Sequence, residues 1–293
     1  MNPVIYFIRN SEVENAFQTR TFFRMDETFV ESKLTDLSLS EIDLSTLKHQ
    51  ESRLVSNFKA QQIEKDCKKH WDIFYKRNEN RFFKDRHWTT REFKELIDAR
   101  DKQIKQTLLE VGCGTGNFIY PLLTEEKSSF FIYACDFSPR AVELVKSNPL
   151  YDESLVKAFV CDVTTEELKK HVDNLDIITL IFVLSAIHPD HFDNVVRTLY
   201  SVLKPGGVVL FRDYGLYDMT QLRFKAGHKI SDNFYMRQDG TRTYFFSVDL
   251  VRDLFCRNGF SEIETSYVRR RTVNKKEGID VPRIFVQAKY KKL

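Results

Sequence analysis

The alternation of short apolar runs with helical stretches between Gln106 and Asp213 constrains the fold more than any other feature. Near-continuous apolar runs are typical of parallel strands that helices cover on both faces. The pattern therefore predicts a doubly wound α/β domain. Its expected strands are Thr107–Val111, Phe130–Cys135, Val156–Cys161, Ile177–Leu184 and Val208–Asp213, and its expected helices lie near Asn117–Leu123, Pro139–Ser147, Glu166–His171 and Phe192–Leu203.

The segments on either side of this alternation should add helices and a closing pair of strands. Apolar residues recur at steps of three and four through residues 53–77, and Thr89 begins a capping-box pattern, so both stretches are expected to be helical. After residue 214 we expect a hairpin at Gln238–Thr241, a helix at Val248–Cys256, and strands near Ile263–Arg269 and Arg283–Tyr290.

Three units follow from these patterns. Residues 1–52 show no sustained period and are expected to form a variable, flexible or partner-dependent arm. Residues 53–105 should form a helical basic segment. Residues 106–293 should form the main domain, with a basic insertion at about 214–246.

The net charge of +3 conceals a strong segregation of charge along the 293 residues. The formal net charge, counted as Lys and Arg residues minus Asp and Glu residues, is −3 for residues 1–56, +5 for 57–105, −7 for 106–203 and +8 for 204–293. Basic residues are interleaved with aromatic ones in both basic segments, for example around Phe82, which suits binding of an RNA.

Several other classes of protein are disfavoured. The longest apolar stretch, Leu175–Ile187, is too short for a membrane span, which needs roughly 18 residues. The first residues are typical of neither a secretory signal nor a transit peptide. Five widely spaced cysteines without a C-x-x-C pattern favour a reducing compartment, the cytoplasm or the nucleus, and a fold without metal. His188 and His191 are close enough in sequence to suggest metal binding, but a turn that caps the next helix is favoured.

Three glycines and two carboxylates mark the binding site for a nucleoside-containing ligand. Gly112, Gly114 and Gly116 follow the first expected strand, where the absence of a Cβ lets a ligand approach the backbone. Asp136 ends the second strand, where its carboxylate can accept hydrogen bonds from ribose hydroxyls. Asp162 ends the third strand, in a place suited to an exocyclic amino group of adenine. The G-x-G-x-G spacing differs from the G-x-G-x-x-G of dinucleotide-binding proteins.

This constellation resembles the class I (Rossmann-like) S-adenosylmethionine-dependent methyltransferases over residues 106–213. The resemblance implies a seven-stranded sheet of order 3-2-1-4-5-7-6. It also implies that Gly112 and Gly114 approach the methionine part of the cofactor, Asp136 the ribose and Asp162 the adenine, with Ile181 lining the pocket.

Residues 55–293 resemble a narrower family, the tRNA 3-methylcytidine methyltransferases of the methyltransferase-like group. The strings that carry the likeness include Trp71–Lys76, Phe82–Trp88, Phe211–Asp218 and Asn233–Arg242. This resemblance implies methylation of cytidine 32 in the tRNA anticodon loop, with S-adenosylhomocysteine as the second product. It also implies that residues 53–105 bind tRNA and cover the cofactor, and that Trp71 and Tyr75, otherwise expected in the core, contact the cofactor.

Two further strings, Arg86–Glu92 and Asn148–Asp152, look most like the branch that modifies serine tRNAs. By resemblance, a seryl-tRNA synthetase is an expected partner that presents the tRNA. Whether that partner is required stays open at this point, as does the oligomeric state.

The expected substrate contacts are basic and aromatic residues outside the cofactor motifs. Arg86 and Trp88 are the first candidates for holding the flipped base or the loop. Arg212, Arg237 and Arg242 are further candidates. Because cytosine N3 has a free lone pair, no base is needed, and a carboxylate would serve to stabilise the cationic product. Asp213 is the first candidate for that role and Asp218 the second.

Two alternatives share the same cofactor fold. A small-molecule methyltransferase would have the same glycine loop and carboxylates but would not need two basic flanks. A catalytically silent tRNA-binding subunit would need the basic flanks but not an intact set of cofactor-binding residues.

Overall fold

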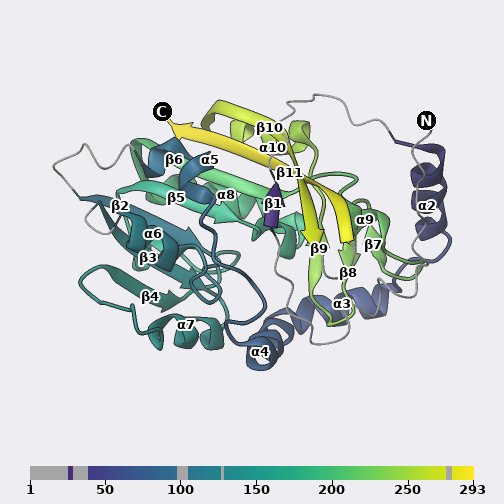
Figure 1. The fold of residues 1–293 in the computed structure, drawn as a ribbon, viewed down its shortest axis with the longest axis horizontal. Helices are drawn as coiled ribbons and strands as arrows, with labels where there is room; N and C mark the ends of the chain where they lie inside the picture. Colours follow the sequence, from purple (N-terminus) through teal and green to yellow (C-terminus); the bar gives the residue numbers. More distant parts are fainter. Residues whose placement is uncertain (1–25, 29–38, 98–104, 127–128, 275–278) are drawn as a thin grey trace.

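The computed structural model describes residues 26–28, 39–97, 105–126, 129–274 and 279–293. Its centre is a mixed sheet in the order β4-β3-β2-β5-β6-β11-β10-β1 (Figure 1). Strands β2 to β6 are parallel, and β11 pairs antiparallel with both β6 and β10. The strands are β1 Asp26–Thr28, β2 Gln106–Val111, β3 Phe130–Asp136, β4 Val156–Val160, β5 Leu175–Ile181, β6 Leu203–Tyr214, β10 Phe260–Asn274 and β11 Ile279–Lys292.

Without β1, the sheet has the predicted order 3-2-1-4-5-7-6, and the class I methyltransferase fold is confirmed. Strand β5 ends at Ile181, three residues before the expected end, because Phe182 adopts a φ of 58°. A β-strand cannot continue through a residue in the left-handed region. The chain turns there into the short 3₁₀ helices η3 (Leu184–Ala186) and η4 (Pro189–His191).

Helices cover both faces of the sheet, as the apolar strands require. Helices α6 (Ile119–Glu126) and α7 (Pro139–Lys146) pack on one face, and α8 (Phe192–Val202) and α10 (Val248–Arg257) pack on the other. The helix expected at Glu166–His171 is only a 3₁₀ turn, η2 (Leu168–Lys170). No helix in the described part of the chain is long and apolar enough to span a membrane.

Among the described residues, four helices and a 3₁₀ turn lie between β1 and β2 in sequence. The expected helix over residues 53–77 is divided near Asp66 into α3 (Asn57–Lys65) and α4 (Cys67–Asn78). Helix α5 (Thr89–Glu92) begins where the capping-box pattern predicted a helix, but it has a single turn and no side-chain cap, and η1 (Lys94–Leu96) follows it.

Part of the expected N-terminal arm is a docked helix, which corrects the prediction for residues 1–52. Helix α2 (Glu41–Glu51) begins with a capping box of Ser40 and Asp43. Its fully buried Gln50 donates hydrogen bonds to the carbonyls of Gln221 (2.8 Å) and Phe224 (3.0 Å). The polar composition of α2 hides this docking, since polar contacts of Gln50 and Glu51 rather than an apolar stripe make it. Residues 1–25 and 29–38 lie outside the described residues.

The basic insertion forms a small unit of its own beside α2 and α3 (Figure 1). It contains α9 (Met219–Leu222) and a three-stranded antiparallel sheet of β7 (Lys229–Ser231), β8 (Phe234–Met236) and β9 (Arg242–Tyr244). The predicted turn at Gln238–Thr241 connects β8 to β9.

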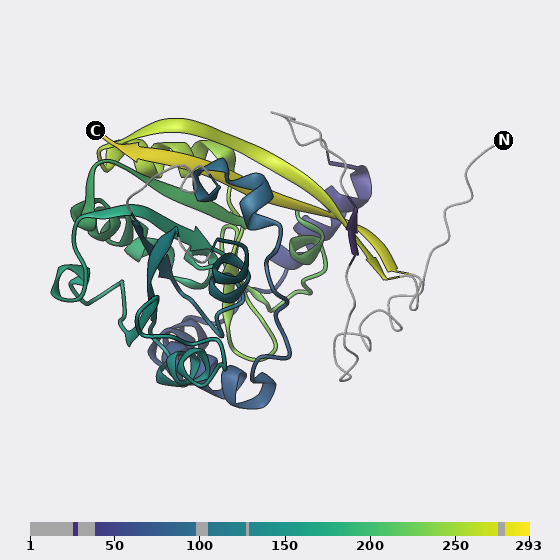
Figure 2. The same cartoon turned by 60° about the vertical axis from the view of Figure 1, so that its left-hand side comes forward.

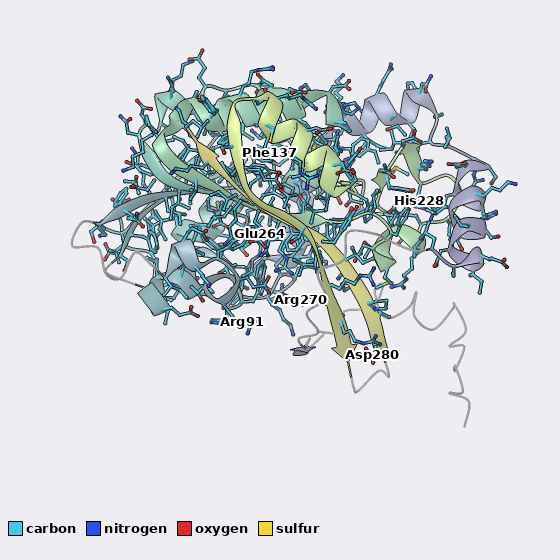
Figure 3. All side chains as sticks on the ribbon, turned by 90° about the horizontal axis from the view of Figure 1, so that it is seen from above. Arg91, Phe137, His228, Glu264, Arg270 and Asp280 are labelled. Carbon is cyan, nitrogen blue, oxygen red and sulfur yellow. The ribbon has the colours of Figure 1, made fainter. Side chains whose placement is uncertain are left out.

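The strands β10 and β11 form a long twisted hairpin whose free end extends beyond the body of the molecule (Figure 2). Asp280 lies toward that free end, and Arg270 lies closer to the body (Figure 3). The carboxylate of Glu92 holds the hairpin to the body, because it pairs with Arg270 at 2.8 Å and also with Arg212.

We expect Phe255→Ala to lower the free energy of unfolding by about 3–5 kcal/mol. The Phe255 ring is fully buried and is stacked on Tyr290 with centroids 4.3 Å apart, so truncation leaves a cavity between α10 and β11. Urea unfolding followed by circular dichroism measures the loss. The matched control is Phe58→Ala, because Phe58 is 79% exposed, and it should change stability by less than about 0.5 kcal/mol. Equal effects of the two substitutions would contradict this account of the core.

Candidate functional site

The glycine loop lies at the carboxyl end of β2, where backbone geometry leaves room for a ligand. Gly112 and Gly114 have φ angles of +64° and +53°, in the left-handed region. A Cβ on Gly112 would lie 2.5 Å from Cγ2 of Val183, and a Cβ on Gly114 would lie 3.1 Å from the Tyr75 hydroxyl. Gly116 has a different role, since a Cβ there would collide with the ring of Tyr120, which packs inside the domain.

Asp136 lies beside this loop as a fixed, buried carboxylate. Its two oxygens accept hydrogen bonds from the backbone N–H groups of Gly114 (3.0 Å) and Ser138 (2.9 Å). Burial raises the pKa of Asp136 to about 6, although both hydrogen bonds lower it. One oxygen is thus bound to the glycine loop itself, and the carboxylate and the loop form a single unit.

Asp162 follows the neighbouring strand β4 and is partly exposed. One of its oxygens accepts hydrogen bonds from the backbone N–H (2.9 Å) and the hydroxyl (2.6 Å) of Thr164. Parallel neighbouring strands end at the same edge of the sheet, so Asp136 and Asp162 lie at adjacent positions of that edge. This is the arrangement that recognition of a nucleoside requires.

Helix α4 brings aromatic side chains to the same edge. The rings of Trp71 and Tyr75 lie 5.8 Å apart, and Tyr75 is buried with its hydroxyl beside Gly114. The helix is attached here because Asp72 accepts a hydrogen bond from the hydroxyl of Ser138, the residue that caps α7. Tyr75, Gly114 and Asp136 therefore form one cluster from three elements.

Arg86 and Glu110 lie near each other inside the site. The Arg86 guanidinium donates a hydrogen bond to the carbonyl of Ile181 (3.1 Å) and lies 5.4 Å from the centroid of the Phe182 ring. Burial raises the pKa of Glu110 to about 8, and the positive charge of Arg86 opposes that rise. Sequence reasoning missed Glu110, although a single acidic residue inside an apolar strand was the available signal.

The first catalytic candidate, Asp213, is fully buried at the end of β6. Its oxygens accept hydrogen bonds from the backbone N–H groups of Ser185 and Tyr214, both at 2.9 Å. Burial raises the pKa of Asp213 to about 6, and the nearby cation of Arg237 lowers it in part. The guanidinium of Arg237 lies 5.5 Å from the centroid of the Tyr214 ring, so the fold brings Asp213, Tyr214 and Arg237 together.

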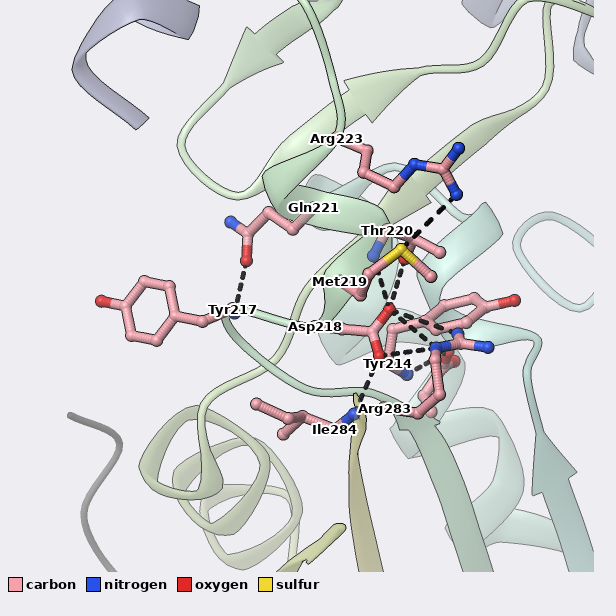
Figure 4. A network of polar contacts seen from close by, with 10 residues as sticks. Tyr214, Tyr217, Asp218, Met219, Thr220, Gln221, Arg223, Arg283 and Ile284 are labelled. Carbon is pink, nitrogen blue, oxygen red and sulfur yellow. Dashed lines mark hydrogen bonds and ion pairs between the residues drawn. The ribbon is translucent and has the colours of Figure 1, made fainter. Parts of the chain in front are cut away.

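The second candidate, Asp218, has a structural role, which corrects the prediction (Figure 4). It is fully buried and caps α9 through the backbone N–H of Thr220 at 2.9 Å. Its other oxygen accepts hydrogen bonds from Arg283 Nε (2.9 Å) and the N–H of Ile284 (2.8 Å). Since the Arg283 guanidinium neutralises its charge and both oxygens are bound within the protein, Asp218 has no charge left for a substrate.

Two expected substrate contacts, Arg212 and Trp88, are instead engaged with each other. Arg212 is 2% exposed, pairs with Glu92, and lies 4.2 Å from the centroid of the Trp88 ring. Trp88 also packs near Phe93 in the core beside α5. The sequence shows the charge of Arg212 but not its internal partner, so the prediction of a substrate contact is corrected for Arg212. Trp88 is partly exposed and remains a candidate for contact with the substrate.

Arg242 is likewise an internal residue rather than a surface cation. It is 4% exposed, pairs with Glu64 of α3, and donates hydrogen bonds to Cys67 Sγ (3.0 Å) and the Ala186 carbonyl (3.1 Å). These contacts tie α3 and α4 to the loop after β5. Arg242 therefore positions α3 and α4. The prediction that Arg242 contacts the substrate directly is corrected.

The histidine turn has the predicted form, and a different group resembles a set of metal ligands. His188 Nδ1 accepts a hydrogen bond from the backbone N–H of Asp190 (3.3 Å) and so caps η4. Among the described residues, Cys161, Glu166 and His171 have donor atoms within 4.8 Å of one another. These residues are five positions apart in the sequence, a spacing that did not suggest a metal site. The turn after β4 brings them together.

Comparisons with known proteins agree with this geometry. Residues 109–209 match the family model described as a methyltransferase domain. Human tRNA N(3)-cytidine methyltransferase METTL6 is 57% identical over 242 residues, which are 82% of this chain and 85% of the relative. The zebrafish (Danio rerio) tRNA N(3)-cytidine methyltransferase METTL2 is 42% identical, over 80% of this chain and 76% of the relative.

A solved structure shows the same fold at low identity. It is a SAM-dependent methyltransferase from Anabaena variabilis, with a TM-score of 0.54 and 13% identity. The match covers 77% of this chain and 95% of that protein.

We expect the stability difference between Asp213→Asn and the wild type to depend on pH. A folded-state pKa of about 6, above the ordinary value of 3.8 for an aspartic acid, means that folding favours the protonated acid. The stabilisation from protonation is present below pH 4 and is lost as pH rises through 6. The variant, which does not titrate, should therefore gain about 3 kcal/mol relative to the wild type between pH 4 and pH 8.

Urea unfolding at a series of pH values measures this difference. The exposed Asp173, which lies before β5, supplies the control Asp173→Asn, for which the difference should stay nearly constant. A constant difference for Asp213→Asn would show that its carboxyl is not buried as described.

Proposed function

Since the chain belongs to the family of tRNA N(3)-cytidine methyltransferases, we propose that it methylates N3 of a cytidine in tRNA with S-adenosylmethionine as the methyl donor. The observation that carries the proposal is the grouping of the glycine loop, Asp136 and Asp213 along one edge of the sheet. We further propose position 32 of the anticodon loop as the target, serine tRNAs as the substrates, a seryl-tRNA synthetase as the presenting partner, and the cytoplasm or nucleus as the location.

The residues present fit S-adenosylmethionine. Gly112 and Gly114 have no Cβ and adopt left-handed φ angles, so this backbone is suited to close contact with the methionine part. Asp136 is positioned for the ribose hydroxyls and Asp162 for the adenine, and Trp71 and Tyr75 would cover the ligand from α4. When bound, the cofactor supplies an electrophilic methyl group on its sulfonium.

Arg86 and Glu110 support this assignment by their charges. Glu110 is 2% exposed, and one of its carboxylate oxygens is buried without a hydrogen-bond partner within the described residues. An unpaired buried acceptor is costly unless a ligand satisfies it. The cationic end of the cofactor's methionine part would do so, while Arg86 holds Glu110 partly ionised.

The chain's contribution to the reaction is positional and electrostatic. Cytosine N3 attacks with its own lone pair, so the protein needs no general base. The product 3-methylcytosine is cationic, and a carboxylate beside it stabilises the charge that develops during transfer. Asp213 supports this role because backbone hydrogen bonds fix both of its oxygens and its carboxylate is ionised above pH 6.

An RNA acceptor is also supported by the exposed surface that surrounds this edge. Lys76, Arg77 and Arg81 are exposed at and beyond the end of α4, and Phe82 beside them is 55% exposed. A cation-rich surface with exposed aromatic rings binds phosphates and stacks bases. A small-molecule methyltransferase would have no use for it.

The test is transfer of tritium from labelled S-adenosylmethionine to total tRNA, followed by mass spectrometry of the nucleosides. We expect label in 3-methylcytidine at position 32 of serine tRNAs, with a higher rate when seryl-tRNA synthetase is added. Label in a metabolite instead would favour the small-molecule alternative. Cofactor binding without any transfer would favour the silent tRNA-binding subunit.

Two glycine variants show whether the labelling depends on the proposed cofactor site. Gly112→Ala should abolish it, because the new Cβ collides with Val183 and φ is +64°. Gly206→Ala is the matched control, since its φ is +80° but a Cβ there meets nothing closer than 3.9 Å.

We expect Asp213→Asn to slow single-turnover methylation by roughly 10- to 1,000-fold while tRNA binding is retained. The wild-type rate should rise with pH through about 6, as the carboxyl loses its proton, and the variant should lose this rise. Rapid-quench measurements between pH 5 and pH 8 test both points, with Asp173→Asn as the control. Full single-turnover activity of Asp213→Asn would show that the carboxylate has no role in the reaction.

A further inference from the structure

A cavity of about 270 Å³ lies between α3, the histidine turn and the basic insertion. Gln61 and Glu64 contribute one wall, His188 and His191 a second, and Phe234 and Arg242 a third. None of these residues except Arg242 was expected to contact a ligand. The cofactor-binding edge described above does not include the cavity.

The cavity suits a flat, uncharged ring. The floor is Phe234, which is 1% exposed, and the His188 ring meets it edge to face with centroids 5.4 Å apart. The charges of Arg242 and Glu64 cancel in an ion pair, and Asp190, which also lines the cavity, lies 3.5 Å from His188 Nδ1. The lining therefore has no unpaired Arg or Lys for a phosphate. Burial lowers the pKa of His188, which favours its neutral form as well. An aromatic floor with neutral polar edges is typical of nucleobase recognition.

Polar groups at the rim have unused hydrogen-bonding capacity. Within the described part of the chain, the ring nitrogens of His191 and the side-chain amide of Gln61 have no hydrogen-bond partner. Gln61 is exposed and His191 partly exposed, so both are accessible from solvent. Imidazole and amide groups both donate and accept, which is what reading the edge of a base requires.

The 3₁₀ helix η3 connects a wall of the cavity with the catalytic edge of the sheet. The wall residue Arg242 donates a hydrogen bond to the carbonyl of Ala186, and the preceding residue, Ser185, donates its N–H to Asp213. The 3₁₀ helix η3 therefore has the cavity on one side and the catalytic carboxylate on the other. A ligand in the cavity would lie close to a base held at Asp213.

We propose that this cavity holds the base of a second tRNA nucleotide, a neighbour of the target cytidine in the same loop. The proposal rests on the proposed tRNA methylation and adds a substrate determinant to it. Splaying two bases into separate pockets holds a single-stranded loop in one conformation, so the cavity contributes to the choice of tRNA as well as to affinity.

The test uses full-length serine tRNAs assembled by ligation, each with one abasic nucleotide in the anticodon loop outside the target. With seryl-tRNA synthetase present throughout, kcat/KM of the wild type should fall roughly 10- to 100-fold at one loop position. His191→Ala and Gln61→Ala should lower kcat/KM on intact tRNA, because they remove contacts between the cavity and the second base. With these contacts already lost, the abasic nucleotide should cause little further fall in kcat/KM. His49→Ala, on the exposed surface of α2, is the matched control and should keep the full effect.

Equal abasic effects in the wild type and both cavity variants would overturn the proposal. A second readout tests binding of a base in the cavity separately from methylation. The fluorescent base 2-aminopurine is placed at the sensitive position, or at each loop position in turn. Its fluorescence should fall when the wild-type protein stacks it in the cavity. Quenching that His191→Ala abolishes would support the cavity even if no methyl transfer were found. Methylation without any quenching by the wild type would overturn the cavity and leave the proposed function in place.

Discussion

One buried carboxylate, that of Glu92, joins three distant parts of the chain. It pairs with Arg212 of β6 and Arg270 of β10, and all three side chains are less than one-tenth exposed. Removing one partner of a buried ion pair leaves the other charge without compensation and lowers the free energy of unfolding by about 3–5 kcal/mol. The position of α5, and with it the entry of Arg86 into the site, depends on this contact, as does the attachment of the long hairpin.

The strands and the glycine loop were predictable from the sequence, whereas the ion pairs and hydrogen bonds between side chains were not. The alternating apolar runs indicated a doubly wound α/β domain, the resemblance to class I methyltransferases implied its sheet order, and the glycine spacing located the loop that contacts Asp136. Arg212, Arg242 and Asp218 were expected at the substrate because the sequence shows a charge near a motif without showing what neutralises it. Helix α2 was missed because polar contacts of Gln50 and Glu51 dock it, and such contacts have no periodicity.

The site combines carboxyls of unlike protonation in a small volume. Burial shifts Asp136 and Asp213 to about pKa 6 and Glu110 to about 8, so near neutral pH the first two are mostly ionised and Glu110 is mostly protonated. Backbone N–H groups hold the two aspartates, and the Arg86 cation lies near the glutamate. Such a division limits the repulsion among three acids while it keeps negative charge on the two aspartates.

The attachment of α2 bears on where the folded unit begins. A shortened chain starting at residue 53, where the sequence suggests a boundary, would lack Gln50 and Glu51. The carbonyls of Gln221 and Phe224 would lose their donor, and Lys229 would lose one of its two carboxylate partners. The smallest version of this protein that keeps its insertion intact therefore starts before Ser40, so a segment that looks dispensable in an alignment of motifs belongs to the folded body.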